Sequence, residues 1–261
     1  MKFKNFIKSV DRIFFKSIGL KIYAEIYSKI LKENLKNNQG YSIEIMYQKD
    51  NDSDLAKLCD YHGSDKGSLS KGPHPYPWTP HSYSDYYEMI FAPMRFNVKK
   101  VFECGIGTNN PKLASNMSVN GKPGASLRVW RDYFPNAQIV GGDVDKSILF
   151  EETRIKTYYI DQTDLQSIQS FWNKVDQEDF DLILDDGLHT VDAGIKLFTQ
   201  SIKKLSPTGF YIIEDVGMHM LFDYIDYFKN KPFKVKYINL NRPKTKIGNN
   251  SLVVIRKTAD S

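Results

Sequence analysis

The sequence predicts a Rossmann-like α/β fold: a mostly parallel seven-stranded sheet with helices on both faces, a terminal antiparallel hairpin and an N-terminal helical extension. Three observations predict it. From residue 98 onward, short apolar runs alternate with longer amphipathic segments. The first run, residues 101–104, leads into a glycine-rich turn at residues 105–108. The last two runs, residues 234–240 and 251–256, follow one another without a helix between them, as the strands of a hairpin do.

Length and composition favour one large domain with an extension. The 261 residues are 41% hydrophobic, enough for a sizeable core. We expect a basic helical extension at residues 1–50, a cap segment at 51–97 and the main domain at 98–261.

No apolar run approaches the roughly 20 residues of a membrane span. The first residues do not resemble a signal peptide, and Cys59 and Cys104 form no CxxC pair, so we expect a reduced, cytoplasmic protein.

The positive charge lies in the extension. The net charge is +5, whereas residues 1–36 hold nine Lys and Arg against three acids, or +6, which leaves −1 for the rest. We therefore expect no nucleic-acid binding by the main domain. Apolar residues in this stretch keep helical spacing with lysines between them. Such a helix packs on the domain or on a second subunit of a homo-oligomer, or lies on the inner membrane surface, and the sequence leaves these choices open.

The cap segment combines a short helix with an irregular stretch. Ser53 is placed to cap a helix that begins at residue 54, and residues 62–67 read HGSDKG. Four prolines between residues 73 and 80 exclude regular structure there. The aromatic and histidine side chains between them indicate a lid or pocket wall, or a packed surface loop. A helix at residues 84–96 follows.

The main domain is predicted element by element. The expected strands are residues 101–108, 137–143, 156–161, 181–184, 209–213, 234–240 and 251–256, and the expected helices are 126–134, 164–175, 193–205 and 218–228. The 193–205 helix should stop at the Ser-Pro-Thr-Gly sequence 206–209. Asp143 stands at the tip of the second strand, where an acid commonly binds ribose hydroxyls; it could equally be a turn residue.

Two acidic pairs follow two successive strands. Residues 180–189 read FDLILDDGLH, so Asp185, Asp186 and His189 come at a strand end, and Glu214 and Asp215 end the next strand. If these strands are neighbours, four carboxylates and an imidazole converge, which is costly without a cation. Hard oxygen ligands favour Mg²⁺. The alternatives are that these residues only cap the following helix or form a solvated strand end.

These motifs together resemble a known family. The glycine turn with Glu103, the acids Asp143 and Asp161, and the late hairpin are similar to class I S-adenosylmethionine-dependent methyltransferases. The HGSDKG sequence at residues 62–67, GASLRVW at 124–130, DDGLH at 185–189 and the pair Glu214-Asp215 resemble the macrocin-type sugar O-methyltransferases. The resemblance covers roughly residues 55–256.

The resemblance implies roles for individual residues. It places metal ligands at Asp186, Glu214 and Asp215, and a general base at His189. It places Glu103, Gly105 and Gly107 at the methionine end of the cofactor and Asp143 at the ribose. Asp161 and Gln162 would lie at the adenine edge, and Asp185 is a further expected contact. Ser64, Asp65 and Lys66 would belong to the segment that closes over the cofactor. The expected cofactors are S-adenosyl-L-methionine and Mg²⁺ or another divalent cation.

The acceptor is less defined than the reaction. The abundance of Lys, Asn and Ile favours an AT-rich genome, and hence a surface-polysaccharide or nucleoside-diphosphate sugar over an antibiotic sugar or a catechol. The Pro/aromatic stretch and Leu188 depart from the family pattern. Arg242, Lys244 and Lys246 are solvated loop residues or phosphate contacts. Two other classes remain: a nicotinamide-dependent oxidoreductase, disfavoured because Asn110 replaces the third glycine of GxGxxG, and a non-enzymatic membrane-bound module.

Overall fold

The computed structural model describes residues 43–47, 52–67, 73–241 and 247–258. The chain divides into two units, Met1–Ile43 and Glu44–Ser261, and the second carries the fold described here. Of the helical extension predicted at residues 1–50, only residues 43–47 are described, and they form a strand and not a helix. The rest of the extension, with its predicted subunit or membrane contact, and the basic loop at 242–246 lie outside the described residues. No helix within the described ranges is long and apolar enough to cross a membrane.

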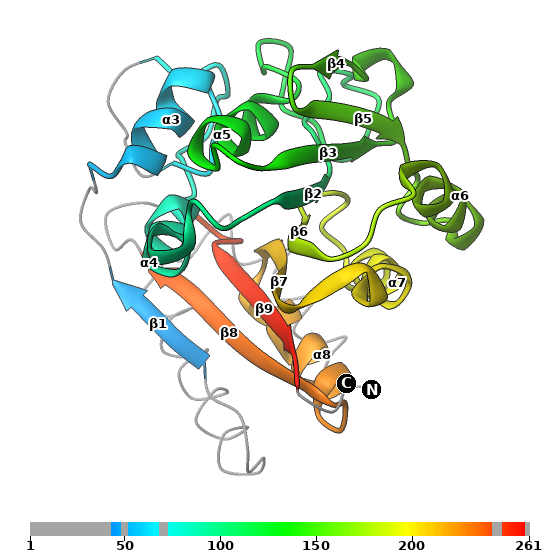
Figure 1. The fold of residues 1–261 in the computed structure, drawn as a ribbon. Helices are drawn as coiled ribbons and strands as arrows, with labels where there is room; N and C mark the ends of the chain where they lie inside the picture. The colour runs from blue at the N-terminus through cyan, green and yellow to red at the C-terminus, as the bar shows by residue number, and fades with distance from the viewer. Residues whose placement is uncertain (1–42, 48–51, 68–72, 242–246, 259–261) are drawn as a thin grey trace. The chain divides into compact units, whose positions relative to one another are not determined.

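The described residues form one nine-stranded mixed sheet with the order β1-β8-β9-β7-β6-β2-β3-β5-β4 (Figure 1). Its strands are β1 (Ile43–Tyr47), β2 (Lys100–Cys104), β3 (Gln138–Asp143), β4 (Glu151–Glu152), β5 (Ile155–Tyr159), β6 (Phe180–Asp185), β7 (Leu205–Val216), β8 (Phe233–Asn241) and β9 (Ser251–Lys257).

The pairing of the strands confirms the predicted fold class. β7, β6, β2, β3 and β5 are parallel neighbours, whereas β9 pairs antiparallel with both β7 and β8. The late runs therefore do form an antiparallel hairpin. The prediction of seven strands was two short: it assigned the mostly apolar β1 to the helical extension, and it missed β4, which has only two residues. Since β6 and β7 are adjacent, the two acidic pairs do end neighbouring strands.

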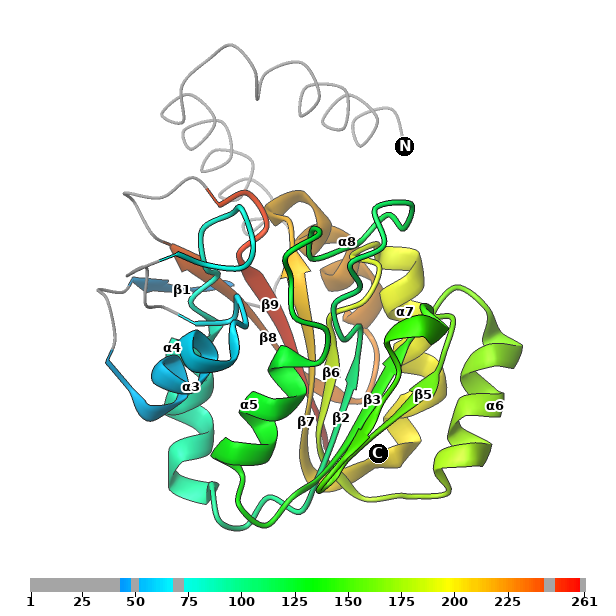
Figure 2. The same ribbon diagram turned by 90° about the horizontal axis from the view of Figure 1, so that it is seen from above.

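Helices cover both faces of the sheet (Figure 2). On one side lie α3 (Asp54–His62), α4 (Tyr83–Phe91) and α5 (Ala125–Tyr133), and on the other α6 (Leu165–Val175), α7 (Val191–Ser201) and α8 (Met218–Phe228). Successive β2 residues show the alternation of a strand: the Phe102 ring packs on Phe171 of α6, and Glu103 accepts a hydrogen bond from Trp130 of α5.

Helix ends follow local chemistry, with two differences from prediction. Ser53, Asp164 and Thr190 each accept a hydrogen bond from a backbone N–H of the first turn of α3, α6 and α7. The helix expected at 84–96 ends at Phe91 and continues as a 3₁₀ turn, Ala92–Met94, because Pro93 lacks an N–H. The helix expected to reach residue 205 ends at Ser201, and residues 206–208 join β7.

The cap segment is tied to itself by backbone hydrogen bonds. Residues 73–82 have no regular structure, as the prolines predict. The N–H groups of His81, Ser82 and Ser84 donate to the carbonyls of Asp65, Gly67 and Lys66, at 2.8, 2.9 and 2.8 Å. These hydrogen bonds fix residues 65–67 beside the start of α4. Consequently Ser64, Asp65 and Lys66 line the cavity at the carboxyl ends of the central strands.

Candidate active site

A cavity of about 600 Å³ lies at the carboxyl ends of the parallel strands, where open α/β sheets bind ligands. That volume is in the usual range for small-molecule sites. The glycine turn, Asp143 and the pair Asp161-Gln162 line one part of it. The cap segment, the 186–189 turn, Asp215 and residues 247–249 line another. The cavity therefore brings most of the predicted site residues together.

The glycine turn is shaped by close backbone approach. Gly105 has φ +88°, and a Cβ built there would lie 2.0 Å from the carbonyl oxygen of Asp186. Gly107 has φ +83°, and its Cβ would lie 2.2 Å from Sδ of Met117. Glycine is required at both positions because side chains would fill this space. The turn consequently brings backbone against the cavity, as a cradle for a bound group requires.

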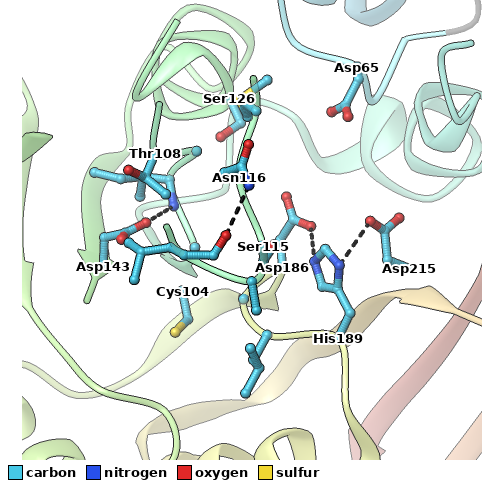
Figure 3. Close-up of a pocket in the computed structure, with 18 of the residues that line it drawn as sticks. Asp65, Cys104, Thr108, Ser115, Asn116, Ser126, Asp143, Asp186, His189 and Asp215 are labelled. Atoms are coloured by element: carbon cyan, nitrogen blue, oxygen red, sulfur yellow. Dashed lines mark hydrogen bonds and ion pairs between the residues drawn. The ribbon is translucent and has the colours of Figure 1, made fainter. Parts of the chain in front are cut away.

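Asp143 is buried at the tip of β3 and stiffens this turn. Its Oδ2 accepts from the N–H of Ile106 at 2.9 Å, and its Oδ1 accepts from the N–H of Asp145 at 2.9 Å (Figure 3). Burial raises the pKa of this carboxyl above its usual range. Each oxygen keeps a second lone pair, and the residue lines the cavity, which is compatible with the predicted hydrogen bonds to ribose.

Asp161 and Gln162 differ in their surroundings. Asp161 is half-buried, and its Oδ1 accepts from the N–H and hydroxyl of Thr163. Gln162 is buried, and its amide bridges Oδ1 of Asp185 at 2.5 Å and the N–H of Leu188 at 2.9 Å. Gln162 therefore positions the turn after β6. Both groups of its amide already make hydrogen bonds within the protein, so the predicted contact with adenine would have to share them.

The prediction that Asp185 contacts the cofactor differs from the structure. This side chain is buried, and it does not belong to the cavity lining. Its Oδ2 lies beside Gly194 of α7, because β6 alternates and points Asp185 away from its neighbour Asp186. Burial raises the pKa of Asp185 to about 6.

His189 lies between two carboxylates (Figure 3). Its Nε2 is 3.2 Å from Oδ1 of Asp186, and its Nδ1 is 3.4 Å from Oδ2 of Asp215. Burial alone would lower the pKa of the imidazole, but Asp215 and Asp186 outweigh it and raise that pKa to about 10. Ligand atoms of these three residues all lie within 4.8 Å of one another. Two hard oxygens and one imidazole nitrogen suit a divalent cation, so these residues fit the predicted metal.

Backbone strain accompanies this geometry. His189 has φ +58° and Asp215 has φ +54°, both in the left-handed region. Non-glycine residues there cost about 1–3 kcal/mol and cluster at functional sites. No pattern in the sequence indicates these dihedral angles.

Glu214 and Lys66 form a second, deeper group. Lys66 is 2% exposed; its Nζ binds Glu214 Oε2, and lies 2.5 Å from Asp186 Oδ2 and 3.2 Å from Glu103 Oε1. Tyr87 donates to the other oxygen of Glu214. Burial would lower the pKa of Lys66, but the three carboxylates raise it well above its usual value. Glu214, predicted as a metal ligand, is therefore linked to Asp186 by the Lys66 ammonium, which forms an ion pair with both carboxylates.

Further cap residues complete the wall of the cavity. Ser64 lines the cavity as predicted. The Nε1 of Trp78 donates to Asp65 at 2.7 Å, and the Trp78 ring stacks on Tyr76, with centroids 5.6 Å apart. The buried His81 has its Nδ1 3.4 Å from Oδ1 of Asp215. The roles of Trp78 and His81 were not assigned from sequence, although the Pro/aromatic pattern does indicate a pocket wall.

The fold is similar to that of a solved methyltransferase. It superimposes on the MycE methyltransferase of the mycinamycin biosynthetic pathway, solved in complex with Mg and SAH, with a TM-score of 0.56 and 22% identity. That superposition covers 80% of this chain and 55% of the other. At such an identity the likeness shows the fold. No family model matches the chain.

The sequence relatives of this chain are named O-methyltransferases. The 8-demethyl-8-alpha-L-rhamnosyl tetracenomycin-C 2'-O-methyltransferase of Streptomyces olivaceus is 31% identical over 162 residues, which are 62% of this chain and 37% of that protein. The mycinamicin VI 2''-O-methyltransferase of Micromonospora griseorubida is 30% identical over 138 residues, 52% of this chain and 32% of that protein. The resemblance to macrocin-type sugar O-methyltransferases is thus confirmed. The matched region spans about a third of each relative.

Proposed function

We propose that this chain is an O-methyltransferase that transfers the methyl group of S-adenosylmethionine to a sugar hydroxyl, with a divalent cation at the acceptor. The observation that carries the proposal is the position of His189 between Asp186 and Asp215, in the same cavity as the glycine turn and Asp143. A base, candidate metal ligands and a candidate cofactor cradle thus share one space.

The cofactor is expected along the glycine turn. Gly105 and Gly107 line the cavity, where we expect its methionine end; Asp143 and Asp161 line the same cavity, where we expect its ribose and adenine edge. The buried Glu103 stands behind the turn, held by Trp130. Relatives with this fold bind the same class of molecule, since the MycE structure contains SAH and Mg.

The acceptor is expected against the cap segment. The half-buried indole of Trp78 is fixed by Asp65, and both residues line the cavity beside His81. An aromatic face next to a carboxylate suits a sugar, because the apolar face of a pyranose can pack on the ring while its hydroxyls donate to the acid. This arrangement suits a sugar acceptor, and the relatives named for a rhamnosyl tetracenomycin and for mycinamicin VI favour a sugar over a catechol.

The protein's chemical work is alignment and proton removal. The sulfonium methyl is already activated, so holding the acceptor oxygen in line with it supplies much of the rate enhancement, up to about 7–11 kcal/mol in favourable models. We propose that His189 accepts the hydroxyl proton; its two ring nitrogens lie 3.2 Å from Asp186 Oδ1 and 3.4 Å from Asp215 Oδ2, so these carboxylates orient the ring. A divalent cation bound by Asp186 and Asp215 would stabilise the alkoxide and remove the negative charge that holds a proton on His189.

The sugar itself is proposed to be a nucleoside-diphosphate or surface-polysaccharide sugar, and a glycoside of a small natural product is the alternative. The relatives support the alternative for the acceptor class, since two of them are O-methyltransferases of tetracenomycin and mycinamicin compounds. The residue composition supports the first.

Transfer of a labelled methyl group tests the proposal. The protein is incubated with methyl-labelled S-adenosylmethionine and panels of nucleoside-diphosphate deoxyhexoses, rhamnosides and catechols, with Mg²⁺ or with excess EDTA. We expect label in a sugar, and we expect EDTA to abolish it. Full turnover in EDTA would refute the role of the metal. Label found in catechols alone would refute the sugar acceptor.

A further inference from the structure

The cap segment presents a carboxylate and an indole together to the cavity. Nε1 of Trp78 donates to Oδ2 of Asp65 at 2.7 Å, and both residues line the cavity. The Asp65 side chain is 19% exposed, and its Oδ1 has no hydrogen-bond partner among the described residues. Figure 3 shows Asp65 on the cap side of the pocket, apart from Asp143. One carboxylate oxygen of Asp65 can therefore receive a group of a bound ligand.

The indole of Trp78 ends a stack of three rings. The rings of His74 and Tyr76 lie 5.0 Å apart at 7°, and those of Tyr76 and Trp78 lie 5.6 Å apart at 27°. Prolines precede each of these residues and restrict the backbone between them. Tyr76 is buried, and its hydroxyl donates to the carbonyl of Ser64 at 3.4 Å. The position of the indole is thus set before a ligand binds, which lowers the entropic cost of binding.

The lining of the cavity, as far as the structure describes it, carries a surplus of negative charge. Its acidic residues are Asp65, Asp143, Asp161, Asp186 and Asp215. The described lining holds no arginine, and its one lysine, Lys66, is 2% exposed and paired with carboxylates. Under the proposed function, two of the acids face the cofactor and two face a metal ion. Asp65 is then the acid that remains for the acceptor.

An ammonium group on the acceptor fits this pair better than a further hydroxyl. The carboxylate of Asp65 offers it a charge-assisted hydrogen bond, and the face of an indole attracts a cation through its quadrupole. Burial raises the pKa of the Asp65 carboxyl above its usual value, and a positive charge beside it would offset that effect. A carboxylate or phosphate on the sugar ring would instead be repelled.

We propose that the acceptor is an amino sugar: Asp65 and Trp78 bind its ammonium group while a hydroxyl of the same ring is methylated. The inference rests on the proposed function for the reaction and names the substrate class. His81 lies between the two ends of this arrangement, with Nε2 3.9 Å from Oδ2 of Asp65 and Nδ1 3.4 Å from Oδ1 of Asp215. One imidazole thus separates Asp65 from Asp215, a span that a substituted pyranose ring can bridge.

Matched sugars test the inference without relying on activity. The probes are the methyl glycoside of rhamnose and its analogues in which one ring hydroxyl is replaced by an amino group. Their affinities for the protein loaded with S-adenosylhomocysteine and Mg²⁺ are measured by calorimetry. We expect at least one amino sugar to bind about tenfold more tightly than the rhamnoside, and Asp65→Asn to remove this preference. The matched control is Asp192→Asn, which removes an exposed acid of α7 paired with Lys196 and should keep the preference.

The outcomes separate this inference from the proposed function. Equal or weaker binding of every amino sugar by the wild type overturns the inference, and so does a preference that Asp65→Asn retains. Labelled methyl transfer is followed in parallel: transfer to the rhamnoside without an amino preference leaves the proposed function standing and refutes the amino sugar. An amino preference in binding, with no transfer to any sugar, supports the inference and counts against sugar methylation. If Asp65→Asn does not fold, as followed by circular dichroism, Trp78→Leu takes its place, and an undiminished preference in that variant overturns the inference.

Discussion

Replacing Asp185 by asparagine should stabilise the protein near neutral pH and leave it nearly unchanged in acid. Oδ1 of Asp185 accepts from Gln162 at 2.5 Å and from the N–H of Gly187 at 3.4 Å, whereas Oδ2 is buried and has no hydrogen-bond partner among the described residues. An asparagine oxygen can keep both bonds at the first position. Its neutral amide removes a charge that the folded state cannot solvate.

The magnitude follows from the raised pKa. Burial raises the pKa of Asp185 from 3.8 to about 6. At about 1.4 kcal/mol for each pH unit, this gap corresponds to about 3 kcal/mol. Because the folded-state pKa is above the unfolded value, the folded protein retains its proton longer, and stability falls as the pH rises from about 4 to about 6 and is level above that. The asparagine variant lacks this loss.

Urea denaturation at several pH values measures the difference. The free energy of unfolding is determined for both proteins between about pH 4 and pH 8, and the wild-type value is subtracted at each pH so that other titrating groups cancel. We expect the difference in favour of Asp185→Asn to grow by up to about 3 kcal/mol across the range between the two pKa values. A difference that does not change with pH contradicts a buried, charged Asp185.

Three further changes probe the cavity. Gly105→Ala should abolish binding of S-adenosylhomocysteine and lower the melting temperature, because its Cβ would lie 2.0 Å from the Asp186 carbonyl oxygen at φ +88°. Gly217→Ala, at φ −65°, is the control. Normal binding by both variants would refute the steric argument. Asp186→Asn should weaken Mn²⁺ binding in calorimetry by more than the roughly 10–100-fold seen for outer-shell partners, and unchanged affinity would exclude it as a ligand. His189→Ala should lower turnover by about 10²–10⁴-fold with unchanged cofactor affinity; unchanged turnover excludes it as the base.

The parts of the fold that sequence predicts are those with a repeating pattern. The strands β2, β3, β5, β6 and β7 are short apolar runs with turn residues after them, and each was found near its predicted bounds. Convergence of Asp186 with Glu214 and Asp215 followed from topology, since the ends of neighbouring parallel strands meet. The two residues of β4 are too few to carry such a pattern. Residues 206–208 of β7 do not carry it either, because Pro207 indicated only the end of the preceding helix.

What sequence could not show depends on side-chain direction and long-range contact. Lys66 lies 120 residues from Asp186 and 148 from Glu214, and no local signal says that its ammonium enters their cluster. Strand alternation could have shown that Asp185 and Asp186 point oppositely, since they are adjacent at the end of β6. The left-handed dihedral angles of His189 and Asp215 are likewise set by the tertiary structure.

The most direct test of the central claim is a calorimetric titration of the wild-type protein with S-adenosylhomocysteine and, separately, with NADH. We predict that S-adenosylhomocysteine binds at one site per chain, that Gly105→Ala loses this binding, and that NADH does not bind. Binding of NADH in the cavity, with no binding of S-adenosylhomocysteine, would contradict methyl transfer as the function of this fold.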